Sequence, residues 1–172
     1  MAWLDPVERS IRRLPAIVTD ASIAGGLVLL GAIELGPGFT SHPGEIGLLV
    51  LGAIGVTLRR RNVWLGFWIV QLATVIGLVL AIPVGETHAG QLEIYIVLYT
   101  VASRRTLKGS AVALVTVLLA DFAGVLYLLA TRQLLPPDIH VTPWIFLFLV
   151  LNEFVWIAFV WFAGRAQHRR HD

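Results

Sequence analysis

The sequence predicts an all-α, polytopic membrane protein: a bundle of six transmembrane helices with both termini in the cytoplasm. Three observations support this fold class. The 172 residues are 57% hydrophobic and 14% charged, with a mean hydropathy of +0.80, unlike soluble globular domains. The apolar residues form continuous runs and do not alternate, which indicates helices and not the strands of a barrel. The basic residues are grouped at regular intervals along the chain.

Twelve of the thirteen Lys and Arg residues form four clusters, which fall at every second gap between apolar runs. Basic residues next to membrane spans stay on the cytoplasmic side. The clusters therefore mark the inner ends of the spans, and only Arg132 lies elsewhere. The first cluster is Arg9, Arg12 and Arg13. We interpret the other three as inner-face anchors: Arg59, Arg60 and Arg61; Arg104, Arg105 and Lys108; Arg165, Arg169 and Arg170.

Residues 1–14 are predicted to be a cytoplasmic amphipathic lead-in, in which apolar residues recur at helical spacing between charged ones. An ordinary cytoplasmic segment explains this stretch equally well. The transmembrane domain then covers residues 15–163. Its length accommodates six spans of about 20 residues, the number needed to cross a core about 30 Å thick, and leaves no room for a water-soluble domain.

The first three spans are predicted at residues 15–35, 39–58 and 62–82. The first outer turn, GPGFTSHPG, is rich in Gly and Pro and contains no Lys or Arg. Arg59–Arg61 then form a short inner turn between the second and third spans. The chain leaves the cytoplasm again in the third span.

The fourth span, residues 85–103, is the least apolar, because it contains Glu93, Tyr95, Tyr99 and Thr100. The distribution of basic residues nevertheless requires a membrane span at this position. The third span ends outside, whereas Arg104 and its neighbours belong inside, so the chain has to cross back between them.

The last two spans are predicted at residues 109–130 and 143–163. They are joined by an outer loop that contains two consecutive Pro residues. Residues 164–172 form a basic cytoplasmic tail.

Polar side chains of four spans fall at one depth in the predicted bundle. Counting 1.5 Å per residue from the inner ends gives depths of roughly 15 to 20 Å, near the middle of the membrane. A charged carboxylate there is costly unless it is paired or hydrated. The layer is therefore either a proton or cation site, or a polar switch, or a set of neutral groups that hold helices together. It consists of Gln71, Glu93, Asp121, Asn152 and Glu153; Asp20 lies shallower, roughly 10 Å in.

Each outer loop carries one His with an acidic residue nearby. His42, His88 and His140 form a weak candidate for an outer-face zinc or pH-sensing site. Chance placement of His at exposed helix ends is the alternative. No metal or other cofactor is assigned, and the absence of Cys excludes disulfides and Cys-ligated metals.

Enzyme motifs are absent from the sequence. It contains no Gly-rich phosphate-binding loop, no HExxH and no GxSxG, so we expect no enzymatic activity. A pI near 9.5 could indicate nucleic-acid binding. Because the basic residues flank apolar runs, the lipid bilayer is the expected partner instead, and nucleic acid is not.

Three segments resemble a known family. They are LLVLGAIGVTLRRRNVWLGFWIV, EIYIVLYTVASRRTLKGSAVALV and WIAFVWFAGRAQHRR, and they are similar to the N-terminal membrane domain of actinobacterial-type sensor histidine kinases. The resemblance covers most of the chain from about Arg12 onward. It implies a multi-pass protein of the bacterial plasma membrane. His171 and Asp172 do not match the phosphoacceptor box of that family, and no ATP-binding motif is present, so no kinase core is expected in this chain.

The resemblance implies a signal-input domain of the two-component type, which relays an envelope or membrane cue to a partner. It also implies a homodimer or a membrane or cytoplasmic signalling partner. Two other classes of function stay open at this point. The acids of the polar layer also suit a small proton- or cation-coupled transporter or channel. A non-catalytic membrane scaffold subunit would need the same helices for assembly alone.

Overall fold

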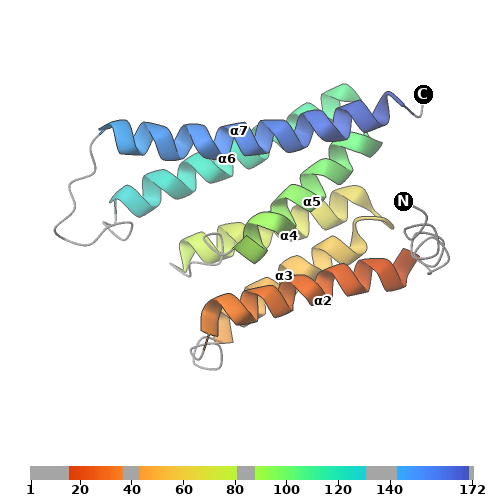
Figure 1. Ribbon diagram of the computed structural model, residues 1–172, viewed down its shortest axis with the longest axis horizontal. Helices are drawn as coiled ribbons and strands as arrows, with labels where there is room; N and C mark the ends of the chain where they lie inside the picture. Colours follow the sequence, from red (N-terminus) through yellow and green to blue (C-terminus); the bar gives the residue numbers. More distant parts are fainter. Residues whose placement is uncertain (1–15, 37–42, 81–87, 131–142, 171–172) are drawn as a thin grey trace, which may run out of the picture.

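The computed structural model describes residues 16–36, 43–80, 88–130 and 143–170, and these consist of six α-helices without any strand. The all-α class and the order of the helices are therefore confirmed over the described ranges (Figure 1). The predicted lead-in, residues 1–14, lies outside them. The helices are α2 (Ala16–Leu35), α3 (Pro43–Leu58), α4 (Val63–Val79), α5 (His88–Arg104), α6 (Leu107–Ala130) and α7 (Pro143–His168).

Local signals in the sequence explain several helix ends. Gly36 follows α2 with a φ of 58°, a left-handed conformation that glycine adopts without a steric penalty. Pro43 and Pro143 occupy the first positions of α3 and α7, where proline loses no helical hydrogen bond. Asn62 caps α4, since its side-chain oxygen accepts a hydrogen bond from the backbone N–H of Leu65 at 3.1 Å.

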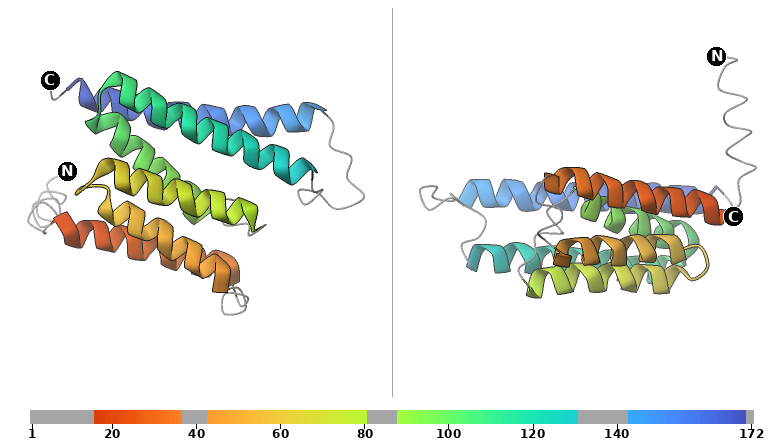
Figure 2. Two further views of the ribbon diagram at one scale, coloured as in Figure 1. Left: turned by 180° about the vertical axis from the view of Figure 1, so that it is seen from behind. Right: turned by 90° about the horizontal axis from the view of Figure 1, so that it is seen from below.

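Helix α5 lies at the centre of the fold and packs against each of the other five described helices. Figure 1 shows it between the α6–α7 pair and the group formed by α2, α3 and α4, and the left view of Figure 2 shows the same arrangement from behind. It is also the least apolar helix of the six. The predicted span with the lowest hydrophobicity is thus the helix that the other described helices surround.

The α3–α4 hairpin is packed with its two backbones in contact. A Cβ atom added to Gly66 would lie 2.6 Å from the carbonyl oxygen of Gly55 and 2.8 Å from the Cα atom of Arg59. A Cβ atom added to Gly55 would lie 2.9 Å from the carbonyl oxygen of Gly66. Because even a methyl group does not fit at either position, these two glycines allow the close approach of α3 and α4.

Basic residues gather at one end of the bundle. The turns between α3 and α4 and between α5 and α6 lie at this end, together with the start of α2 and the C-terminal end of α7 (Figure 1). Of the thirteen Lys and Arg residues, Arg9, Arg12, Arg13 and Arg132 lie outside the described ranges, and the other nine all belong to this end. We call it the basic end.

Of the predicted bundle of six membrane spans, the structure confirms the six helices. Among the described residues one segment, Leu107–Tyr127 in α6, has both the length and the hydropathy of a membrane span. Helices α3 and α4 are apolar, but their 16 and 17 residues fall short of the roughly 20 that cross a bilayer core. Helix α5 also has 17 residues and carries polar side chains.

The bounds of several predicted spans differ from those of the helices. The described part of α3 begins at Pro43, and residues 39–42 of the predicted second span lie outside the described residues. Helix α4 ends at Val79, three residues before the predicted end of the third span. Helix α7 continues to His168, five residues beyond the predicted end of the last span at residue 163. The first part of the predicted basic tail is therefore helical and continuous with α7.

The hairpin geometry predicts that Gly66→Ala destabilises the protein, whereas Gly26→Ala does not. Overpacking at Gly66 should cost about 1–3 kcal/mol. Gly26 has open space around its Cα, with nothing within 4 Å of an added Cβ, so alanine there should be neutral or stabilise by about 0.5–1 kcal/mol. Thermal unfolding of the two purified variants checks this. Equal unfolding midpoints would show that α3 and α4 are not in close contact at Gly66.

Candidate functional site

Glu93 lies on the face of α5 that packs against α3. Its side chain is 3% exposed, and its carboxylate occupies the space beside the Cα atom of Gly52, where any Cβ would collide with it. Its Oε1 atom is buried without a hydrogen-bond partner among the described residues. Gly52 thus makes room for a buried acid in the centre of the bundle.

Tyr95 lies two residues later, on the opposite side of α5, because successive residues of a helix are 100° apart. Its hydroxyl group donates a hydrogen bond to Oε2 of Glu153 on α7, at 3.1 Å. Asp121 of α6 lies close enough to Glu153 for the two carboxylates to repel each other when both are charged, and its Oδ2 atom is buried without a hydrogen-bond partner among the described residues. Tyr95 and Glu153 therefore join α5 to α7, and Asp121 adds a side chain of α6 to what we call the polar cluster.

The predicted polar layer is divided in space. Asp121 and Glu153 come together, whereas Glu93 faces α3. Gln71 is buried within α4, with its Nε2 atom unpaired among the described residues. Asn152 is exposed and points away from the cluster that contains its neighbour Glu153. The functional role of these residues stays a prediction.

The outer-face histidines cannot be placed as a group. His42 and His140 lie outside the described residues, and so does the side chain of His88, although His88 begins α5. In the part of the chain that the structure describes, no group of three or more His, Asp or Glu side chains could hold a metal ion. The zinc or pH-sensing site is not tested.

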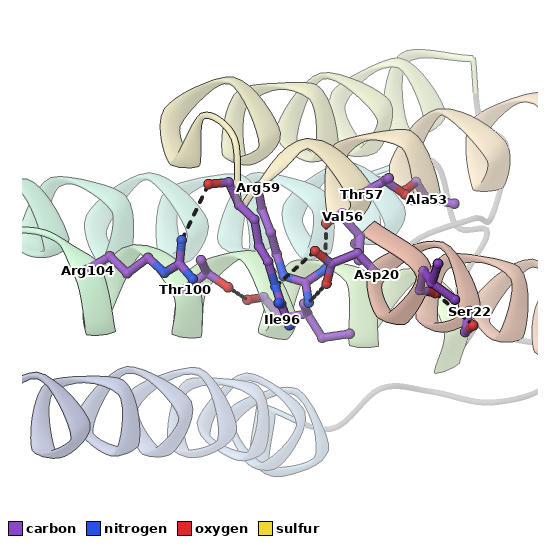
Figure 3. A network of polar contacts seen from close by, with 11 residues as sticks. Asp20, Ser22, Ala53, Val56, Thr57, Arg59, Ile96, Thr100 and Arg104 are labelled. Carbon is purple, nitrogen blue, oxygen red and sulfur yellow. Dashed lines mark hydrogen bonds and ion pairs between the residues drawn. The ribbon is translucent and has the colours of Figure 1, made fainter. Parts of the chain in front are cut away.

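Asp20 of α2 forms the strongest polar contact at the basic end. Its Oδ1 atom lies 2.9 Å from Nη2 of Arg59, and its Oδ2 atom lies 2.9 Å from Nε of Arg60 (Figure 3). Asp20 is 2% exposed, and the side chains of Arg59 and Arg60 are 8% and 39% exposed. Arg59 also donates from Nη1 to the carbonyl oxygen of Val56. The two ion pairs of Asp20 hold α2 to the α3–α4 turn.

Burial lowers the pKa of the Arg59 guanidinium from its ordinary value, although the Asp20 carboxylate acts in the opposite direction. An arginine does not lose its proton in proteins. The buried Arg59 therefore carries a full charge, and the fold needs the Asp20 carboxylate beside it.

The C-terminal end of α7 is attached to the α5–α6 turn by side chains that bind backbone carbonyl groups. Arg165 donates from Nη1 to the oxygen of Arg105 at 2.8 Å. Nδ1 of His168 lies 3.0 Å from the oxygen of Ser103, and the indole N–H of Trp161 donates to the oxygen of Ser110 at 3.0 Å. We call these three contacts the α7 lock.

A cavity of about 540 Å³ opens at the basic end between α5 and α7. Its polar rim includes Arg60 and Arg104, and its apolar wall includes Tyr99 and Phe159. The cavity reaches along α5 as far as Tyr95, the residue that binds Glu153. It therefore connects the basic end with the polar cluster.

Sequence reasoning missed two of these features. It placed Asp20 near the inner end of the first span but assigned it no partner. The signal was present, since an acid inside a predicted span is expected to pair with a base, and Arg59 ends the following span. The cavity had no signal in the sequence, because it depends on how far α5 and α7 lie apart.

Comparison with known proteins places these residues in a family without giving them a role. The family model described as a domain of unknown function, DUF7134, matches residues 7–171, a range that includes every described helix. No curated protein matches the chain, and no solved structure matches it.

The ion-pair geometry predicts a graded loss of stability along the arginine triplet. Arg59→Gln should cost about 2 kcal/mol, because it leaves the buried Asp20 with one partner fewer. Arg60→Gln should cost about 1 kcal/mol or less, since its side chain is partly hydrated. Arg61 is exposed, and Arg61→Gln should stay within about 0.5 kcal/mol of the parent. Unfolding midpoints measured under one condition check the order, and three equal values would contradict it.

Proposed function

The chain belongs to the DUF7134 family, whose function is unknown, and from its own residues we propose that it is a membrane-embedded signal-input domain. In this proposal its helices form a six-span bundle in the bacterial plasma membrane, with both termini in the cytoplasm. It relays a membrane or envelope cue through α7 to a second copy or to a signalling partner at the basic end. The observation that carries the proposal is the continuity of α7 from the polar cluster to the α7 lock.

Exposed apolar side chains support the membrane placement. Every described helix presents large hydrophobic residues to the surroundings; for example, Ile33, Val79 and Phe148 are 68%, 69% and 69% exposed. Soluble monomers rarely expose apolar surface on this scale. In the most apolar part of α6 only 17% of the residues are buried, whereas the core helix of a soluble protein is mostly buried. Lipid would cover these surfaces.

The basic end supports the orientation. Nine Lys and Arg residues are located there, and the other end of the described helices has none. Glu34 and Glu45 belong to that other end. Under the positive-inside rule, the basic end faces the cytoplasm.

The path of α7 supports the relay. Glu153 and His168 are fifteen residues apart on one uninterrupted helix, which corresponds to about 22 Å. Glu153 accepts a hydrogen bond from Tyr95 of α5, while Arg165 and His168 bind carbonyl oxygens of Arg105 and Ser103 at the basic end. A small rotation or shift of α7 at the polar cluster would therefore move its C-terminal end. The resemblance to sensor-kinase membrane domains is consistent with this direction of transmission.

A proton- or cation-coupled carrier is the second candidate. It is favoured by Oε1 of Glu93 and Oδ2 of Asp121, which are buried without hydrogen-bond partners among the described residues, as expected for groups that bind and release a cation. A passive scaffold is the third class, in which the polar cluster affects only assembly and stability.

The orientation is tested by accessibility of single cysteines, since the chain has none of its own. In intact cells a membrane-impermeant maleimide should label Gly44→Cys at the start of α3. It should label Arg61→Cys and Lys108→Cys only after the membrane is made permeable. All three positions are exposed in the structure. Labelling of Arg61→Cys in intact cells would exclude the proposed orientation.

The relay is tested by breaking the Tyr95–Glu153 contact and measuring the position of the end of α7. Spin labels at Arg61→Cys and Arg169→Cys report the distance between the α3–α4 turn and the basic end of α7 in lipid vesicles. Tyr95→Phe and Glu153→Gln should each shift or broaden this distance on the order of 1–2 Å. Asn152→Ala is the matched control, because Asn152 is exposed beside Glu153, and it should leave the distance unchanged.

The same vesicles separate the three classes of function. If the distance between the two spin labels is unchanged in Tyr95→Phe and Glu153→Gln, the relay is excluded. A proton or cation flux that is lost in Asp121→Asn, together with an unchanged distance, assigns the protein to the carriers. Changes in thermal stability alone assign it to the scaffolds.

A further inference from the structure

The cavity at the basic end combines two chemically different parts. With about 540 Å³ it has the size of a small-ligand pocket. One part is lined by guanidinium groups of the α3–α4 turn and of the end of α5, and the other part by aromatic and aliphatic side chains of α5 and α7. A ligand that fills both parts has an anionic group and an apolar chain.

The charged part has an excess of positive charge. Arg59, Arg60 and Arg104 line it, and Asp20 is the acid that pairs with the first two. Three positive charges and one negative charge leave a net charge of +2. Arg60 binds Asp20 through its Nε atom, and its side chain is 39% exposed. Arg104 is also exposed, and it donates a long hydrogen bond of 3.5 Å to the carbonyl oxygen of Arg60. Donors for a phosphate group are therefore available.

The apolar part is open at its side. Tyr99 and Phe159 are 39% and 62% exposed, so a ligand can enter between α5 and α7 from the bilayer and need not pass through the protein. From Arg104 to Tyr95 the wall extends over nine residues of α5, which is about 13 Å. This length accommodates the glycerol group and the first part of an acyl chain.

We propose that this cavity binds an anionic phospholipid of the cytoplasmic leaflet. The phosphate lies between Arg60 and Arg104, and an acyl chain follows Tyr99 and Phe159 toward Tyr95. The proposal rests on the membrane placement and orientation proposed above, because only then does the basic end meet the anionic lipids of the inner leaflet. Free inorganic phosphate shares the chemistry of the headgroup but lacks the chain.

A lipid bound in this cavity would be the cue for the proposed relay. The acyl chain would contact Tyr95, whose hydroxyl group holds Glu153 of α7. It would also contact Phe159, which belongs to α7 itself. Occupancy of the cavity therefore acts on α5 and α7, the two helices that the Tyr95–Glu153 hydrogen bond joins, and the composition of the inner leaflet becomes the signal.

Ligand-induced thermal stabilisation tests the site in the full chain, purified in a non-ionic detergent. Three probes are titrated at constant ionic strength: dioctanoyl phosphatidylglycerol, dioctanoyl phosphatidylcholine and inorganic phosphate. Phosphatidylglycerol should raise the unfolding midpoint in a saturable manner. The other two probes should not raise it at the same concentrations, because one lacks the net negative charge and the other lacks the chain.

Amino-acid substitutions test whether the stabilisation by phosphatidylglycerol arises from this cavity. Arg60→Gln with Arg104→Gln should weaken the apparent affinity for phosphatidylglycerol roughly tenfold or more, as the loss of charge-assisted hydrogen bonds implies. Arg61→Gln with Lys108→Gln is the matched control. It removes the same charge from exposed positions of the basic end that do not line the cavity, and it should bind as the parent does. Ala163→Leu places a larger side chain at a lining position and should abolish stabilisation without any change of charge.

Each contrary result overturns the proposal in a recognisable way. Equal stabilisation by phosphatidylcholine shows that charge is irrelevant, and equal stabilisation by phosphate shows a free-anion site. Equal weakening in the control pair shows diffuse surface attraction, and no stabilisation by any probe shows no site. If phosphatidylglycerol binds but the distance between the spin labels at Arg61→Cys and Arg169→Cys does not change, the lipid site stands and the relay is excluded. If Tyr95→Phe or Glu153→Gln changes that distance but phosphatidylglycerol does not bind, the relay stands and the lipid site is excluded.

Discussion

The enclosure of α5 is the constraint on which the rest of the structure depends. This helix is the least apolar of the described six, yet it packs against each of the other five. It buries Glu93 and Thr100 together with fully buried apolar residues such as Val97 and Val101. Polar groups on a helix are costly when they face hydrocarbon. In the proposed membrane placement, a bundle that surrounds α5 satisfies this requirement and leaves the more apolar helices at the periphery, where their exposed side chains meet the lipid.

Contacts at the two ends hold the outer helices to this centre. At the basic end Asp20 joins α2 to the α3–α4 turn, and the α7 lock joins α7 to the α5–α6 turn. At the other end the backbone N–H of Ala89 donates to Oε2 of Glu34, so α2 also contacts the start of α5. The lock uses backbone carbonyl groups as acceptors, which gives α7 a defined position without a second buried ion pair. Such a contact can be rearranged at a lower cost than the Asp20 pair, whose separation would leave a buried charge uncompensated.

Tyr95 connects the two parts of the molecule to which we assign function. It binds Glu153 in the polar cluster, and it lines the inner end of the cavity that begins at Arg60 and Arg104. The opposite face of α5 carries Glu93 against Gly52 and has no part in either feature. In the proposed relay, a cue that enters beside α7 acts on one side of α5, while α3 packs against the other side at Gly52.

The amino-acid sequence by itself determined the helical class, the approximate helix bounds and the gathering of the basic residues at one end. These properties follow from local composition, from the spacing of the apolar runs and the arginine clusters, and from helix-starting residues such as Pro43 and Asn62. The sequence also predicted that Asp121 and Glu153 lie at similar distances from the basic ends of their helices, because that distance depends only on the rise per residue. The direction of each side chain around its helix was decided by the tertiary structure alone. Packing between helices turned Glu153 inward and Asn152 outward, separated Glu93 from the cluster, paired Asp20 with Arg59, and left the cavity between α5 and α7. These outcomes depend on contacts between residues far apart in the chain, which no local pattern contains.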